Sequence, residues 1–226
     1  SAYNLSTSAA QSGTGGGGGF GGSGGTVATG VPQEIATVGP DGTQLNIKLT
    51  ADRDLSATYD AVVSQYGTTI QNACENSSVS NCAGLVAAII AQENGGRTTG
   101  TSPAGALGIM QLMPANGGAN CDSSDAACIA DQIQKGVSYL KNTCAADSGV
   151  ANCVAAYNGG NGTTPGSSPS GKNPAFATSS TDPAVGCGAS HYAWQCTTRP
   201  GGLVETQKYV ANVCAVLSVK NLTSCK

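Results

Sequence analysis

One acidic residue closes an almost wholly apolar stretch of the chain. The segment LVAAIIAQENGG, residues 85–96, places Glu93 just before an asparagine and two glycines. On a helix, the apolar residues three, four and seven positions earlier share a face with this glutamate: Ile90, Ile89 and Val86. A carboxyl group at the rim of an apolar wall is desolvated, which raises its pKa. The pattern therefore predicts a general acid that works near neutral pH.

A surface glutamate at the C-terminal end of a helix is the alternative interpretation. That position is mildly unfavourable, because the C-terminal end of the helix dipole prefers cations. The two glycines after Glu93 and Asn94 should end the helix and let the chain open into the wall of a cleft.

Two further segments combine polar side chains with glycines. In SPAGALGIMQLMP, residues 102–114, Gln111 interrupts an apolar run, and Gly105 and Gly108 permit close backbone approach or a positive φ. In AAYNGG, Tyr157 and Asn158 stand at an expected helix end. Either segment could instead be structural, the first as a loop with core residues and the second as a helix C-cap.

The elements that must position these residues are mainly helices. Helical spacing of apolar residues or a continuous apolar face predicts five of them, at 54–75, 81–93, 123–146, 148–160 and 201–220. Residues 31–53 form a β-prone lead-in with a Pro-Asp-Gly turn, which indicates a small hairpin. Residues 1–30 are a Gly-rich flexible tail or linker by composition. We expect a mainly α domain over 54–226, with a loop-rich insertion at 160–200.

Ten cysteines in 226 residues indicate an oxidising compartment. They fall into close sequential couples, so we expect neighbour pairing: Cys74–Cys82, Cys121–Cys128, Cys144–Cys153, Cys187–Cys196 and Cys214–Cys225. There is no Cys-x-x-Cys and a single histidine, so no zinc or other metal site is expected.

Composition excludes several kinds of partner. The formal net charge is −3 and only 10% of residues are charged, so we expect neither nucleic-acid binding nor a polybasic membrane anchor. The chain begins with Ser1 and has no run of 18 apolar residues. We therefore expect a processed product outside the cytoplasm, whether secreted, periplasmic or at the cell surface.

Four segments in order resemble the soluble lytic transglycosylase catalytic domain, of the lysozyme-like superfamily that includes goose-type lysozymes. AQENGG resembles the catalytic-glutamate motif, GALGIMQLMP the Gly-Leu-Met-Gln-Leu-Met-Pro motif and AAYNGG the Ala-Tyr-Asn-Ala-Gly motif. ETQKYV, residues 205–210, resembles the Glu-Thr-Arg-x-Tyr-Val motif. Two departures stand out: Asn94 replaces the usual serine, and Gln207 replaces the usual arginine.

The resemblance implies a lysozyme-like helical fold and a role for each matching residue. Glu93 is the expected sole acid/base, and no cofactor is implied. Gln111 is expected to contact a sugar N-acetyl group and Tyr157 to orient Glu93. The remaining expected site residues, which line the cleft or contact the substrate, are Asn94, Met110, Asn158 and Tyr209.

The implied substrate is the glycan strand of peptidoglycan, cleaved between N-acetylmuramic acid and N-acetylglucosamine with formation of a 1,6-anhydro ring. Ordinary glycosidases use two carboxylates, yet no Asp or Glu lies between Glu93 and Asp122. Two alternatives stay open. One is a hydrolytic muramidase in which Asp122 or Asp125 positions a water, and the other is a non-catalytic, disulfide-rich glycan-binding protein. The Gly-rich tail would suit a tether to envelope, secretion or pilus machinery.

Overall fold

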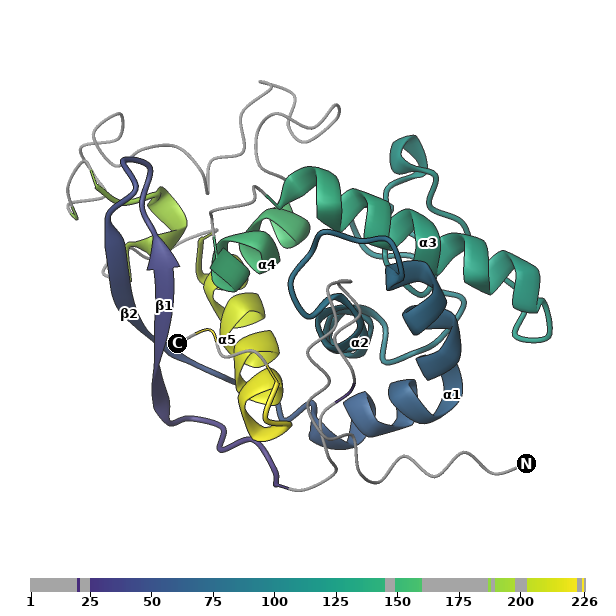
Figure 1. The fold of residues 1–226 in the computed structure, drawn as a ribbon, viewed down its shortest axis with the longest axis horizontal. Coiled ribbons are helices and arrows are strands. Elements are labelled where there is room, and N and C mark those ends of the chain that lie inside the picture. Colours follow the sequence, from purple (N-terminus) through teal and green to yellow (C-terminus); the bar gives the residue numbers. More distant parts are fainter. Residues whose placement is uncertain are drawn as a thin grey trace. The chain divides into compact units, whose positions relative to one another are not determined.

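A computed structural model describes residue 20 and residues 25–144, 149–159, 187, 190–197, 203–222 and 225. The fold is mainly helical with one small hairpin, which confirms the expected fold class (Figure 1). Most of the expected 1–30 tail and 160–200 insertion lie outside the described residues. The helices and strands are β1 Pro32–Val38, β2 Gln44–Thr50, α1 Ser56–Cys74, α2 Cys82–Glu93, α3 Ala126–Thr143, α4 Gly149–Gly159 and α5 Leu203–Val219, with 3-10 turns η1 Pro114–Asn116 and η3 Ala193–Gln195.

The chain forms two compact units that each draw on separate parts of the sequence. The first unit contains the described residues of 1–26, 55–137 and 216–223. The second unit contains those of 27–54, 138–215 and 224–226. The expected boundaries at residues 30 and 53 stay predictions.

The first unit is built around α2. Residues 82–91 of this helix are all buried, because alanine, valine, leucine and isoleucine cover its whole circumference. Helix α1 packs against it (Figure 1). The residues of α1 that turn inward recur at helical spacing, namely Tyr59, Val62, Tyr66 and Ile70.

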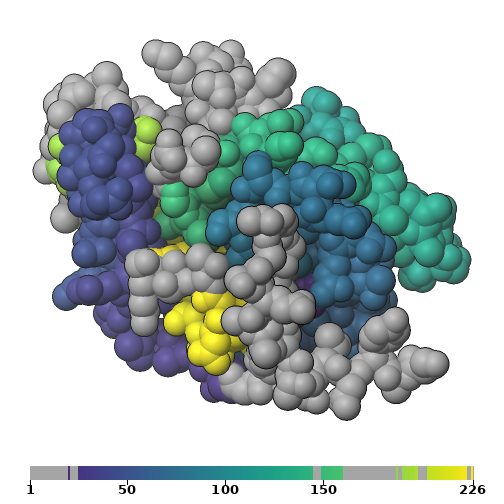
Figure 2. All heavy atoms as spheres, viewed as in Figure 1, coloured from purple at the N-terminus to yellow at the C-terminus, as the bar shows by residue number. Residues whose placement is uncertain are grey.

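The second unit places the hairpin against α4 and α5. Strands β1 and β2 pair antiparallel, with Ile35 opposite Ile47, and their turn includes Gly42 at a φ of +84°. One face buries Ile35, Ile47 and Leu49, whereas the residues of the other face are exposed or half-buried. The hairpin forms part of the molecular surface (Figure 2, purple). This alternation is the period of two expected of a half-buried sheet.

A buried polar cluster fastens the hairpin to α4 and η3. The Thr37 hydroxyl donates to Asn152 Oδ1 at 3.0 Å, and Gln195 Nε2 donates to Thr37 Oγ1 at 2.8 Å. Asn152 and Gln195 both donate to the Val38 carbonyl as well. Each buried amide thus has a partner, which removes the cost of its desolvation.

The structure contains five disulfides, each between sequence neighbours as expected: Cys74–Cys82, Cys121–Cys128, Cys144–Cys153, Cys187–Cys196 and Cys214–Cys225. Within the described residues, no helix combines the length and apolar character needed to span a bilayer.

Candidate active site

Glu93 stands where the buried helix α2 meets solvent. It is the last residue of α2 and is partly exposed, whereas residues 82–91 are buried. Gly95 and Gly96 follow with φ of +62° and +81°, a conformation that side chains with a Cβ rarely adopt. These glycines end the helix, as the sequence predicted, and leave the carboxylate at the helix terminus.

The next residue, Asn94, turns its side chain inward. It is buried, and its Nδ2 donates to the carbonyl oxygens of Arg97, Thr99 and Gly108 at 2.9, 2.9 and 3.2 Å. Its Oδ1 accepts hydrogen bonds from the Arg97 guanidinium. The expected substrate contact of Asn94 stays a prediction. The geometry gives this side chain a different task, which is to hold the segment that follows Glu93.

Gln111 belongs to the same hydrogen-bonded segment. Its backbone has a φ of +47°, which is unusual for a residue with a Cβ and marks a constrained position. Its Nε2 donates to the Gly108 carbonyl at 2.7 Å and lies 3.4 Å from the Gly100 carbonyl. The Oε1 atom has no hydrogen-bond donor among the described residues, so it can accept one from a ligand.

Met110 lies in the core instead of at the surface. Its side chain is 1% exposed. It packs against α3 at Gly136, where an added Cβ would lie 2.3 Å from the Met110 methyl carbon. The expected place of Met110 in a cleft lining stays a prediction, and its burial favours a packing role behind Gln111.

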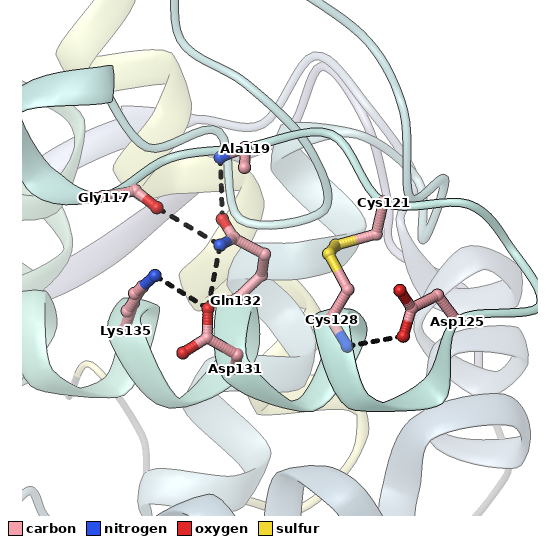
Figure 3. Close-up of polar contacts among 8 residues, drawn as sticks. All are labelled: Gly117, Ala119, Cys121, Asp125, Cys128, Asp131, Gln132 and Lys135. Atoms are coloured by element: carbon pink, nitrogen blue, oxygen red, sulfur yellow. Dashed lines mark hydrogen bonds and ion pairs between the residues drawn. A yellow bond between two sulfur atoms is a disulfide. The ribbon is translucent and has the colours of Figure 1, made fainter.

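Sequence reasoning missed the residue that anchors the far end of this segment, Gln132 on α3. Its Oε1 accepts from Ala119 N–H at 2.9 Å, and its Nε2 donates to the Gly117 carbonyl at 3.2 Å (Figure 3). A signal was present, because Gln132 lies three residues after Ile129 and so shares its core-facing side.

The start of α3 is fixed by two local devices. Asp125 caps the helix by accepting a hydrogen bond from Cys128 N–H at 2.9 Å (Figure 3). The disulfide Cys121–Cys128 joins the same turn to the end of the preceding loop.

Asp131, further along α3, pairs with Lys135 at 2.7 Å, and this hydrogen-bonded cation holds the pKa of Asp131 below its usual value.

In the second unit, the other two motifs meet. Asn158, at the end of α4, accepts a hydrogen bond from the Thr206 hydroxyl of α5 at 3.0 Å. Tyr157 is buried and meets Tyr139 edge to face, with ring centroids 5.3 Å apart. Tyr209 is also buried on α5. The expected bond from Tyr157 to Glu93 would join residues of different units and stays a prediction.

Gln207, which replaces the arginine usual in the motif, has a clear structural partner. Its Nε2 donates to the carbonyl oxygens of Trp194 and Cys196 at 2.9 and 3.2 Å. Trp194 is fully buried beside the Cys187–Cys196 bridge. The replacement thus ties α5 to η3.

These features describe disulfide-bridged helices with a partly exposed carboxylate, Glu93, at the end of the buried helix α2. Residues 69–174 match the family model described as the transglycosylase SLT domain. This match confirms the family that the motifs indicated, over residues 69–174. Glu93, Gln111 and the Tyr157–Asn158 pair lie inside the matched range, whereas Tyr209 lies beyond it. No curated protein and no solved structure matches the chain.

Proposed function

We propose that this protein is a peptidoglycan lytic transglycosylase with Glu93 as its single acid/base. The observation that carries the proposal is the position of Glu93. It is a partly exposed carboxylate at the end of an otherwise buried helix, inside an SLT domain. SLT domains are in general glycan-cleaving, and the resemblance of the motifs indicates the bond between N-acetylmuramic acid and N-acetylglucosamine.

In the proposed reaction, protonated Glu93 donates its proton to the glycosidic oxygen, and the bond from that oxygen to C1 of the muramic acid breaks. The N-acetylglucosamine then leaves with a new hydroxyl. The substrate's own N-acetyl group stabilises the positive charge that develops at C1. Glu93, now a carboxylate, takes the proton from the C6 hydroxyl while O6 bonds to C1. This closes the 1,6-anhydro ring, and no water is consumed.

The acidic residues near α3 support a single-carboxylate mechanism. Asp122 accepts hydrogen bonds from both the N–H and the hydroxyl of Ser124, which lower its pKa. Asp125 is engaged as the helix cap. Both carboxylates thus have local structural tasks, which weakens the hydrolytic alternative in which one of them positions a water.

Gln111 supplies the proposed recognition of the sugar. Its Nε2 is directed to protein carbonyls, so the Oε1 is the atom left to accept a hydrogen bond from a substrate N-acetyl N–H. Tyr157, Asn158 and Tyr209 remain proposed cleft residues, on the strength of their motifs. Five disulfides fit an enzyme that meets its substrate outside the cytoplasm.

The decisive experiment incubates purified peptidoglycan with the protein and with the Glu93→Gln variant, and measures product masses. We expect products that end in 1,6-anhydro-muramic acid with the wild-type protein and none with the variant. Products heavier by one water would establish a hydrolytic muramidase instead. No products from a correctly disulfide-bonded wild-type protein would favour the glycan-binding alternative.

A further inference from the structure

One buried amide on α3 holds the far end of the segment that carries Gln111. The Gln132 side chain is 2% exposed and lies between Gly117 and Ala119 (Figure 3). It uses both of its polar atoms on the backbone there, the Oε1 as acceptor from Ala119 N–H and the Nε2 as donor to the Gly117 carbonyl. Residues 117–119 therefore cannot move without breaking hydrogen bonds to a buried side chain.

Ala119 in turn fixes the position of Gly108. A Cβ added at Gly108 would lie 2.1 Å from the Ala119 carbonyl oxygen, so this oxygen lies directly against the Gly108 backbone. The Gly108 N–H donates to the Gly100 carbonyl at 3.1 Å. The backbone of Gly108 is thus held between Ala119 on one side and Gly100 on the other.

Gly108 then determines where the Gln111 side chain lies. Its carbonyl accepts hydrogen bonds from Gln111 Nε2 at 2.7 Å and from Gln111 N–H at 3.3 Å. The side chain's other partner, the Gly100 carbonyl, is at 3.4 Å and belongs to the same confined group. A shift of Gly108 therefore moves the Oε1 that we propose for the substrate.

We infer that Gln132 is a positioning residue that sets the place of Gln111 against the N-acetyl group of the glycan, through Ala119 and Gly108. This inference rests on the proposed function. Gln132 itself touches no substrate, and its effect on catalysis passes through Gln111. Misplacing a substrate-binding group by about 1 Å can cost up to about a hundredfold in rate, so a remote amide can matter this much.

The test is a double-mutant cycle on kcat/KM, with a soluble, uncross-linked glycan strand of defined length as substrate. Gln132→Leu keeps the volume of the side chain and removes its hydrogen bonds to Ala119, Gly117 and Asp131. We expect it to lower kcat/KM by about tenfold or more in the wild-type background, but by less than about twofold in the Gln111→Ala background. Gln134→Leu, on an exposed position of the same helix, is the control and should change kcat/KM by less than about twofold. Equal losses from Gln132→Leu in both backgrounds would overturn the inference.

A second variant guards against misfolding. Gln132→Met also lacks the hydrogen bonds of Gln132 but has an unbranched side chain of similar volume, so it should show a similar loss with the same dependence on Gln111. An additive loss from this variant would also contradict the inference.

A readout without substrate separates this inference from the proposed function. The NMR signals of the Gln111 side-chain amide should shift and exchange faster with solvent in Gln132→Leu, and stay unchanged in Gln134→Leu. Unchanged Gln111 signals in a folded Gln132→Leu protein would overturn the inference. A wild-type protein without any cleavage activity would overturn the proposed function, and the NMR comparison would still decide whether Gln132 positions Gln111.

Discussion

Asn94 and Gln111 donate hydrogen bonds to the same oxygen, the carbonyl of Gly108, at 3.2 and 2.7 Å. The first of these residues directly follows Glu93, and the second is the polar residue of the Gly-rich motif. One glycine carbonyl therefore links the end of α2 to the proposed sugar-binding amide. The family usually has a serine after the catalytic glutamate, and its shorter side chain could not reach as many carbonyls as this asparagine does.

Replacing Asn94 by alanine should destabilise the protein by about 2 kcal/mol, because carbonyls of Arg97, Thr99 and Gly108 lose a buried donor. Asn94→Ser, which restores the family's usual residue, should recover only part of this loss because its hydroxyl is a single donor. Urea unfolding measures both variants. An Asn94→Ala protein as stable as the wild type would show that the hydrogen bonds of Asn94 do not hold this segment.

Gly108→Ala should be the more harmful of two glycine substitutions in the same motif. Gly108 has a φ of +74°, and a Cβ added there would clash with the Ala119 carbonyl. We therefore expect the free energy of unfolding to fall by about 3 kcal/mol. Gly105→Ala is the matched control. Gly105 has a φ of +90° but nothing within 4 Å of the added carbon, so about 1 kcal/mol is expected. Thermal unfolding compares the two, and equal losses would exclude the steric contribution of Ala119.

The two partners of a half-buried ion pair, Lys220 and Asp60, should respond unequally to mutation. Lys220 has a side chain that is 1% exposed, and its Nζ lies 2.7 Å from both carboxylate oxygens of Asp60, which is 46% exposed. Asp60→Asn leaves the buried cation without its counter-charge, so we expect a loss of about 2 kcal/mol, reduced from the fully buried case because water reaches Asp60. Lys220→Met removes the buried charge itself and should cost less. Urea unfolding at neutral pH tests the order, and a more harmful Lys220→Met would reverse this account.

Asp52 should make stability depend on pH in the acid range. A hydrogen bond from Asn212 and, after it, the nearby Lys208 lower the pKa of Asp52 from its usual 3.8. The ionised form is thus favoured by folding, so its stabilising effect is present above pH 3.8 and is lost as the pH falls through the lower folded-state pKa. Asp52→Asn should therefore be slightly less stable than the wild type at neutral pH, by less than about 1 kcal/mol because the pair is exposed. The difference in the free energy of unfolding between the two proteins should shrink as the pH falls below 3.8. Urea unfolding at several pH values measures it, and a difference that stayed constant would contradict this account.

The local sequence determined the secondary structure and the identity of the proposed acid. Apolar spacing predicted helices that bury one face, such as α1, and α2 was recognisable because it is apolar all round. Neighbouring cysteines were paired correctly because their short separations bring them together within or beside single elements. The end of α2 at Glu93 followed from the two glycines, whose backbone freedom is a local property.

Only the tertiary structure decided how the polar side chains are used. The sequence around Asn94 does not indicate that its amide donates to the Gly108 carbonyl. The periodicity of α3 predicts that Gln132 faces inward, but not that it accepts a hydrogen bond from Ala119 N–H. The same applies to Gln207, whose partners are the carbonyls of η3 and the following cysteine. Local propensity is set by a residue's chain neighbours, whereas a buried amide takes whatever donor or acceptor the packing of distant segments brings within about 3 Å.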